Sequence, residues 1–174
     1  MKETKYLLAS AFNIFRYDIL VKALTENELK SLNVLIKKFI EDNLQIHDAK
    51  LFSNNHSQYI YLWKSISLQN AQSNAITIIS GFHNQYDKLN FIDFPRIELT
   101  IGLTATKEDE ILENNEKALA LIKNVSILSE NCILYGVNNL ISEELLSEHN
   151  HFREIDKRIF YMKNDPTIIY SLIN

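Results

Sequence analysis

The stretch "KLFSNNHSQYIYLW", residues 50–63, contains two short apolar, aromatic-rich runs on either side of a polar turn. Aromatic and β-branched residues favour strands, and Asn and Ser favour turns. The pattern therefore predicts a β-hairpin, with one strand around residues 50–52, the other over residues 58–63, and the turn at "NNHSQ".

Helices and strands alternate on either side of this hairpin. Residues 6–15 are apolar with small residues inside and predict a buried strand. Residues 25–43 predict a helix that starts with a capping box of Thr25 and Glu28. A second helix is expected over residues 68–82. In residues 96–105 apolar side chains alternate with Glu98 and Thr100, which predicts a strand. Residues 107–124 predict a third helix, and "NCILYG", residues 131–136, a last short strand.

This order, β-α-β-β-α-β followed by α-β, predicts an α+β protein of the ferredoxin-like type, with a mostly antiparallel sheet and helices on its face. The tail is expected to differ. Residues 142–162 have helical amphipathic spacing and predict a linker helix, and residues 167–174 predict a strand with no hairpin partner in the remaining chain.

The composition is that of an ordinary globular chain, with 46% hydrophobic and 23% charged residues among 174. A net charge of −4, with Lys and Arg scattered, argues against nucleic acid as a partner. Cys132 is the single cysteine, so no internal disulfide forms, which fits the cytoplasm. No apolar run approaches the ~20 residues of a membrane span, so no membrane contact is expected, although a parent protein could be membrane-attached.

Several strings, in this order, resemble a GGDEF domain, the family that makes cyclic di-GMP from two GTP molecules. "IELTIGLTATKEDEILENNEKALALIK", residues 97–123, is similar to the family's "VTVSIGIA" strand and the helix after it, with Gly102 at the family's glycine. "FNIFRYDIL" resembles its "DxDxFKxIN". The hairpin places Asn55, His56, Ser57, Gln58 and Tyr59 at the signature pentapeptide. The resemblance covers about residues 6–136 and implies a nucleotidyl cyclase-like sheet.

The tail resembles the helix and first strand that lead into an EAL domain, the cyclic di-GMP phosphodiesterase. The resemblance therefore implies a GGDEF domain over residues 1–138, and a linker with the start of an EAL-like domain over residues 139–174. On this basis the partners are an adjoining EAL-like domain and, as a second possibility, another copy of the chain in a homodimer.

The resemblance also predicts that the active site is degenerate. The family holds magnesium with carboxylates from the first strand and the signature turn, where this chain has Ala11 and Ser57, with Asn13 at the neighbouring acidic position. Asn55 and His56 replace two glycines, and the guanine-contacting position is Ile19. No metal site and no cofactor are therefore expected; magnesium and GTP would bind only if activity were retained.

Two weaker nucleotide contacts are implied. Lys123 matches a phosphate-contacting lysine, but Glu130 stands where the family has its arginine partner. The family's inhibitory "RxxD" is represented by Gln45 and Asp48, so the arginine that binds cyclic di-GMP is missing.

The sequence thus predicts a catalytically inactive GGDEF domain that acts as a regulatory or dimerising module for an EAL domain. Two alternatives remain open. One is a divergent diguanylate cyclase that uses another acid, with Asp18 the nearest carboxylate after the first strand. The other is a protein-interaction domain with no nucleotide role.

Overall fold

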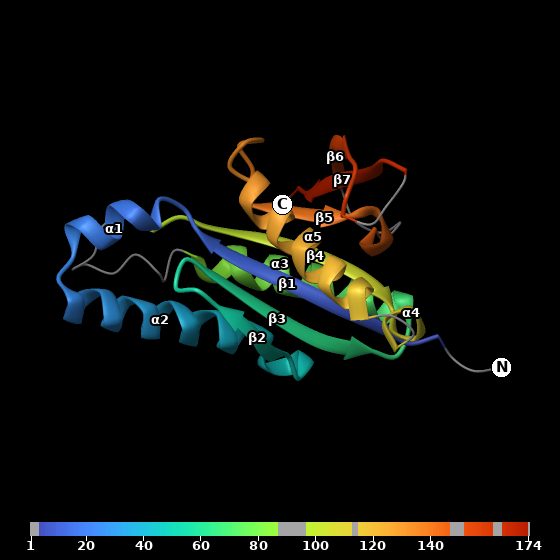
Figure 1. Cartoon of the computed structure of the whole chain (residues 1–174), viewed down its shortest axis with the longest axis horizontal. Helices are drawn as coiled ribbons and strands as arrows, with labels where there is room; N and C mark the ends of the chain where they lie inside the picture. The colour runs from blue at the N-terminus through green and yellow to red at the C-terminus, as the bar shows by residue number, and fades with distance from the viewer. Residues whose placement is uncertain (1–3, 87–96, 113–114, 147–151, 162–164, 174) are drawn as a thin grey trace.

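The computed structural model describes residues 4–86, 97–112, 115–146, 152–161 and 165–173 (Figure 1). The strands are β1 Tyr6–Ile14, β2 Lys50–Asn54, β3 Gln58–Ser65, β4 Leu99–Lys107, β5 Asn139–Ser142, β6 Phe152–Arg158 and β7 Thr167–Leu172. The helices are α1 Tyr17–Ala23, α2 Glu26–Leu44, α3 Leu68–Tyr86, α4 Glu108–Leu112 and α5 Asn115–Asn131, with 3₁₀ turns η1 Gln45–His47 and η3 Glu143–Leu145.

All of these strands form one sheet of seven, in the order β2-β3-β1-β4-β5-β7-β6. The β4–β5 pair is parallel, and every other pair is antiparallel. The predicted α+β class, the β-α-β-β-α-β order and the mostly antiparallel sheet are confirmed. The hairpin at residues 50–63 is confirmed too, because β2 and β3 pair across the predicted turn.

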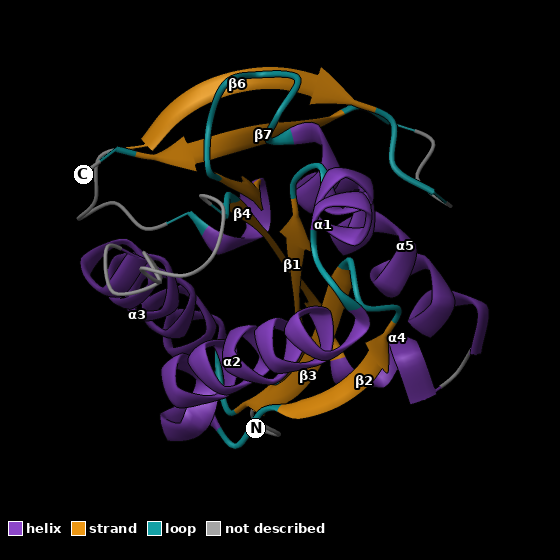
Figure 2. Cartoon of the chain, turned by 90° about the vertical axis from the view of Figure 1, so that its left-hand side faces the viewer, coloured by secondary structure: helices purple, strands orange, loops and turns teal. Residues whose placement is uncertain are grey.

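Helices cover both faces of the sheet (Figure 2). On one face α2 and α3 pack against the sheet, where Leu32, Ile36 and Ile40 of α2 and Ile78, Ile79 and Phe82 of α3 are buried. The capping box of Thr25 and Glu28 starts α2 as predicted. On the other face α5 covers the small residues Ala9 and Ala11 of β1. Alternate residues of β1 therefore serve two separate apolar clusters.

Gly102 sets the distance between α5 and the sheet. A Cβ atom added at Gly102 would lie 2.5 Å from the backbone nitrogen of Ser129 and 2.6 Å from the carbonyl oxygen of Val125, both on α5. Only a residue without a side chain allows this approach, which explains why the glycine stands in the middle of a strand. Thr100, predicted to lie on the strand face opposite the apolar side chains, is buried as well, and so is Thr104.

The strand predicted for "NCILYG" is wrong. Helix α5 continues to Asn131, because Val125, Leu128 and Cys132 are buried at helical spacing. The chain then turns at Gly136, whose φ of 63° lies in the left-handed region that glycine favours after a helix. The closing strand comes later, as β5, and pairs with β4.

The linker helix predicted for residues 142–162 is also wrong over residues 142–146 and 152–161; residues 147–151 and 162 lie outside the described residues. Residues Phe152–Arg158 form strand β6, which pairs with β7 in an antiparallel hairpin. The strand expected at residues 167–174 exists as β7, but it pairs on both edges, with β6 and with β5. Helical spacing of apolar residues was the misleading signal, because pairing with the edge of β7 overrides a local amphipathic pattern. Residues on both sides of the predicted 138/139 boundary thus contribute strands to one sheet.

Candidate functional site

The turn between β2 and β3 is stabilised by its own asparagine side chains. Asn54 Oδ1 accepts a hydrogen bond from the backbone nitrogen of His56 at 2.7 Å. Asn55 Oδ1 accepts from the backbone nitrogen of Gln58 at 2.7 Å and from the Ser57 hydroxyl at 3.0 Å. His56 takes the left-handed conformation, with φ 69°. The side chains of Asn54 and Asn55 therefore accept hydrogen bonds from within the turn and stabilise its conformation.

This turn lies against the end of β1. The backbone nitrogen of Ile14 donates to the carbonyl oxygen of Ser57 at 2.8 Å. Asn13 is paired with Gln58 of β3 on one side and with Thr100 of β4 on the other. The structure thus brings together the strand end and the signature turn that the sequence singled out, and adds the beginning of β4 to them.

Ala11, the predicted position of a lost metal ligand, lies inside an apolar cluster. It is fully buried and packs with Ala9, Ile60, Leu121 and Val125 beneath α5. A carboxylate here would be buried among hydrocarbon side chains, at a large desolvation cost. Ala11 is therefore part of the packing contact between α5 and the sheet.

Gln58 is the centre of a polar cluster between the sheet and α5. Its side-chain nitrogen donates to the Ser129 hydroxyl at 3.1 Å and to Glu130 Oε1 at 3.4 Å, and its oxygen accepts from the Ser126 hydroxyl at 2.7 Å. The Thr100 hydroxyl donates to the carbonyl oxygen of Ser129 at 2.7 Å. These five residues are called the Gln58 cluster below. Gln58 is only 7% exposed, so its amide is satisfied almost wholly by protein groups.

The Gln58 cluster does not fit a magnesium ion. Glu130 is its one carboxylate, and that carboxylate already accepts bonds from Gln58 and Ser126. Magnesium binds through carboxylates and waters in octahedral geometry, and amides and hydroxyls alone hold it poorly. Within the described ranges, no group of three or more His, Cys, Asp or Glu side chains could hold a metal ion.

The other predicted contacts lie apart from the Gln58 cluster. Lys123 places its ammonium 4.0 Å from the centre of the Tyr161 ring, as a cation–π pair. Gln45 belongs to η1, and Asp48 follows it with a left-handed φ of 52°. Both therefore lie where the chain enters β2, which is the end of the hairpin opposite its turn.

Three further sequence positions have ordinary structural roles. Asp18 is exposed on α1 and forms an ion pair with Lys22 at 3.9 Å. Ile19 is 49% exposed on the same helix. Tyr59 is buried, and its hydroxyl donates to the carbonyl oxygen of Asn33 at 3.3 Å. Burial raises the pKa of Tyr59 to about 12, so this phenol is neutral near pH 7.

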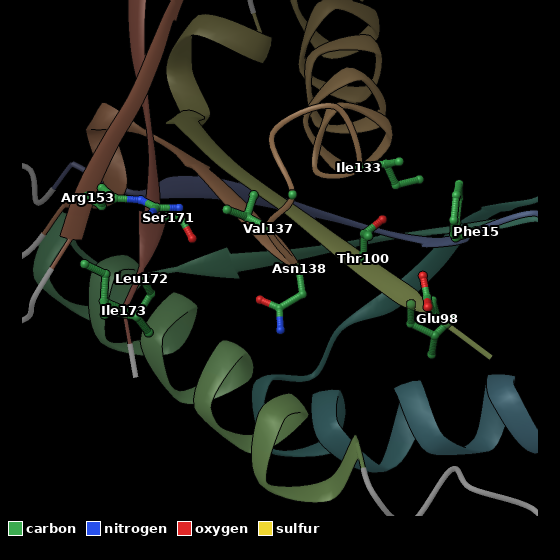
Figure 3. A pocket seen from close by; sticks show the side chains of 12 residues that line it. Phe15, Glu98, Thr100, Ile133, Val137, Asn138, Arg153, Ser171, Leu172 and Ile173 are labelled. Carbon is green, nitrogen blue, oxygen red and sulfur yellow. The ribbon is translucent and has the colours of Figure 1, made fainter. Parts of the chain in front are cut away.

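An open cavity of about 690 Å³ adjoins the end of β1 on the side of β5 and β7. Figure 3 shows Phe15 and Glu98 at one end of it, Arg153 and Ser171 at the other, and Asn138 between them. The Asn138 amide nitrogen lies 3.0 Å from His83 Nδ1. Among the described residues that line it, Arg153 is the one cationic side chain.

Sequence reasoning missed Ser126 and Ser129 as partners of Gln58, and Thr100 as a donor to the carbonyl oxygen of Ser129. The signals in the sequence were weak. Thr100 was expected on the strand face opposite the apolar side chains, and Ser126 and Ser129 are ordinary polar residues of a helical segment. Serine inside a helix is neutral to unfavourable unless it has a specific bond to make, and here both serines bond across to the hairpin or within α5.

Three solved structures share the arrangement described above. The adenylyl cyclase CyaB from P. aeruginosa is 16% identical, with a TM-score of 0.69 over 98% of this chain and 95% of that chain. The dimeric guanylyl cyclase domain of the RhoGC fusion protein from Blastocladiella emersonii is 9% identical, with a TM-score of 0.70 over 97% and 96% of the two chains. The guanylate cyclase domain of RhGC from Catenaria anguillulae, in complex with GTP, is 7% identical, with a TM-score of 0.69 over 97% and 96%.

The chain has the nucleotidyl cyclase fold. The similarity extends over nearly its whole length, so β6 and β7 are included in the match. No protein-family model matches the sequence, and no curated protein matches it. Of the helices that the structure describes, none has the length and apolar character needed to cross a bilayer.

Proposed function

We propose that this chain is a nucleotidyl cyclase-like domain that has lost catalysis and regulates a signalling protein by associating with another domain. The observation that carries the proposal is the Gln58 cluster. A phosphoryl-transfer site needs carboxylates to hold magnesium, whereas this cluster has the single carboxylate of Glu130 and otherwise neutral side chains that are hydrogen-bonded to protein groups.

Two further observations support the loss of catalysis. Ala11 is buried under α5, so the first-strand position lacks both the ligand and the space for one. Lys123, the remaining candidate for a phosphate contact, is directed to the Tyr161 ring. Because the polar side chains of the Gln58 cluster bond to one another, the domain would act by binding another protein rather than by catalysis.

Two partners are proposed, a second copy of this chain and an EAL domain. A homodimer is supported by the fold, since one neighbour of this fold is described as a dimeric guanylyl cyclase domain. Association with an EAL domain, and with it a role in cyclic di-GMP signalling, rests on sequence resemblance alone. The tail that suggested it, residues 139–174, contains the β6–β7 hairpin of this sheet. Sedimentation of the isolated chain tests the homodimer, and the coding sequence next to the chain tests the EAL domain.

Catalysis is tested with radiolabelled GTP and ATP in the presence of magnesium. We expect no cyclic mononucleotide and no cyclic di-GMP by chromatography. The double variant Asn13→Asp with Gln58→Asp places carboxylates on directly paired residues of β1 and β3, which share one face of the sheet, so it should gain magnesium binding by calorimetry that the parent chain lacks.

The rival cyclase hypothesis predicts a different result from the same assay. Product formed by the parent chain and lost in Asp18→Ala or Glu130→Gln would overturn the proposal. Micromolar binding of GTP without product would instead assign a nucleotide-sensing role. An interaction domain without any nucleotide role predicts neither binding nor product, together with association by sedimentation.

A further inference from the structure

The last turn of α3 is joined to the start of β5 by a histidine and two asparagines. The Asn138 amide nitrogen lies 3.0 Å from Nδ1 of His83, and the Asn139 amide nitrogen lies 3.3 Å from Nε2 of the same ring. Asn138 Oδ1 accepts a hydrogen bond from the Asn139 amide at 3.1 Å. Figure 3 shows the Asn138 side chain directed toward α3. These three residues are called the His83 junction below.

The orientation of the Asn139 amide is fixed by the neighbouring strand. Strand β5 pairs with β7 through Ile141 and Ser142. Before this pair, the Asn139 side chain takes the place of a backbone partner for Leu172. Its Oδ1 accepts from the Leu172 backbone nitrogen at 2.8 Å, and its amide donates to the Leu172 carbonyl oxygen at 3.3 Å. Asn139 is 1% exposed, so turning its amide would break both bonds with no water to replace them.

The number of amide hydrogens determines which nitrogen of His83 carries the proton. An amide nitrogen has two hydrogens and can only donate. The two hydrogens of Asn139 go to Leu172 and to Asn138, so none is left for Nε2 of His83. The Asn138 amide is directed at Nδ1. In the neutral ring Nδ1 is therefore the acceptor, and the proton lies on Nε2.

Protonation of His83 places one donor opposite another. The added proton goes to Nδ1, toward which the Asn138 amide already directs a hydrogen. Asn138 can turn its oxygen toward the imidazolium only by giving up the bond from Asn139, whose buried amide then lacks an acceptor. In either arrangement the His83 junction loses a hydrogen bond.

The surroundings of His83 offer little charge to offset an added proton. Among the described residues no carboxylate bonds to the ring. From α2, the uncharged Phe39 contacts Phe82, which precedes His83. The acidic turn η3 bonds the beginning of α3, away from His83. In the cavity beside the junction the charged groups are Glu98, which precedes β4, and Arg153 of β6, and their charges are opposite. Burial thus lowers the pKa of His83.

We propose that the His83 junction is a pH-sensitive switch that holds α3 to the β5–β7 pair when His83 is neutral and releases it when His83 is protonated. Because the folded junction holds fewer protons than the released one, release becomes easier as the pH falls below the ordinary histidine pKa of 6.5. Asn138 also lines the cavity of about 690 Å³, so release changes one wall of that cavity. The switch does not depend on the function proposed above, because it follows from the contacts of these side chains alone.

Nuclear magnetic resonance of the histidine rings tests the starting state. With ¹⁵N-labelled histidine at pH 8, long-range proton–nitrogen correlations should show His83 with its proton on Nε2 and with a bare Nδ1. The signal is assigned by its loss in His83→Asn. The opposite tautomer, or an imidazolium at this pH, would overturn the proposal.

Hydrogen–deuterium exchange followed by mass spectrometry tests the release. Protection of residues 79–86, corrected for the intrinsic pH dependence of exchange, should fall about tenfold between pH 7.5 and pH 5, or ~1.4 kcal/mol. Because the opening is local, dilute urea should hardly affect exchange in this segment, whereas it should accelerate exchange in β1. Unchanged protection at pH 5, or a urea sensitivity equal to that of β1, would refute the switch.

Two variants with different expectations locate the effect. His83→Asn keeps an acceptor near the position of Nδ1 but does not titrate, so the protection of residues 79–86 should no longer depend on pH. Asn138→Asp places a carboxylate opposite Nδ1 that accepts from the imidazolium, so protection should rise as the pH is lowered to 5. His47→Asn, at another histidine whose pKa is lowered, is the matched control and should behave as the parent does. A pH dependence that persists in His83→Asn, or that keeps its sign in Asn138→Asp, would contradict the assignment to His83.

Discussion

Replacing Gly102 by alanine should destabilise the protein more than any other single methyl group added to a described glycine. The new Cβ would lie 2.5 Å from the Ser129 backbone nitrogen and 2.6 Å from the Val125 carbonyl oxygen. Neither atom belongs to a flexible side chain, so the clash cannot be relieved by a rotamer change. Ordinary contact begins at 3.4 Å, and α5 would have to move away from β4 by about 0.9 Å.

Such a movement has two costs. Overpacking in a well-packed interior usually costs about 1–3 kcal/mol. Displacing α5 would also lengthen the bonds that join Ser126 and Ser129 to Gln58 across the interface. We therefore expect about 3 kcal/mol of lost stability, which corresponds to a melting temperature lower by roughly 6–12 °C for a chain of this size.

Urea unfolding followed by circular dichroism measures this difference, with Gly136→Ala as the control. Gly136 has a φ of 63° and no atom within 4 Å of its added Cβ, so its substitution reports backbone strain alone, roughly 1–2 kcal/mol. If Gly102→Ala proved no more destabilising than Gly136→Ala, the close packing of α5 on β4 would be wrong.

Four further measurements test individual features. Gln58→Leu should cost roughly 1–3 kcal/mol in urea unfolding, because its hydroxyl partners on α5 lose their bonds; a neutral effect would contradict the Gln58 cluster. Burial raises the pKa of Cys132 to about 12, so iodoacetamide at pH 8 should modify it only as fast as the protein unfolds, and rapid labelling of the native chain would refute its burial. Burial lowers the pKa of His47 and of His83, so each side chain holds fewer protons in the folded than in the unfolded state. The free energy of unfolding should therefore fall as the pH drops below the ordinary histidine pKa of 6.5. A urea midpoint that rises when the pH is lowered from 7.5 to 5 would contradict this prediction. Thr25→Ala should cost about 1 kcal/mol through loss of the α2 capping box, whereas no change would show that the cap is not used.

The Gln58 cluster joins three elements of the fold through polar side chains. Its bonds join β3, β4 and α5, the elements that meet at the end of β1. In an active phosphoryl-transfer centre, carboxylates repel one another until a metal neutralises them. The Gln58 cluster has uncharged hydroxyls, one amide and a single carboxylate, Glu130, which accepts hydrogen bonds from Gln58 and Ser126, so no second carboxylate repels it and the junction is stable without an ion.

Local patterns in the sequence determined the elements whose partners are near in the chain. Alternation predicted β4, the capping box predicted the start of α2, and the two apolar runs predicted the β2–β3 hairpin, because each depends on neighbouring residues. The sequence also showed that Ala11 and Ser57 carry no carboxylate, since that is a matter of residue identity alone.

Tertiary structure decided whatever depends on distant contacts. Residues 152–158 form a strand because the edge of β7 is available to pair with them, and their helical spacing gave no sign of it. Thr100 is buried and bonded because α5 covers the second face of the sheet, which its alternation along β4 could not reveal. Gln58 reaches Ser129, seventy-one positions later in the chain, only after β3 and α5 have packed. Pairing and burial are properties of surfaces that meet after folding, and no local periodicity encodes which surfaces those are.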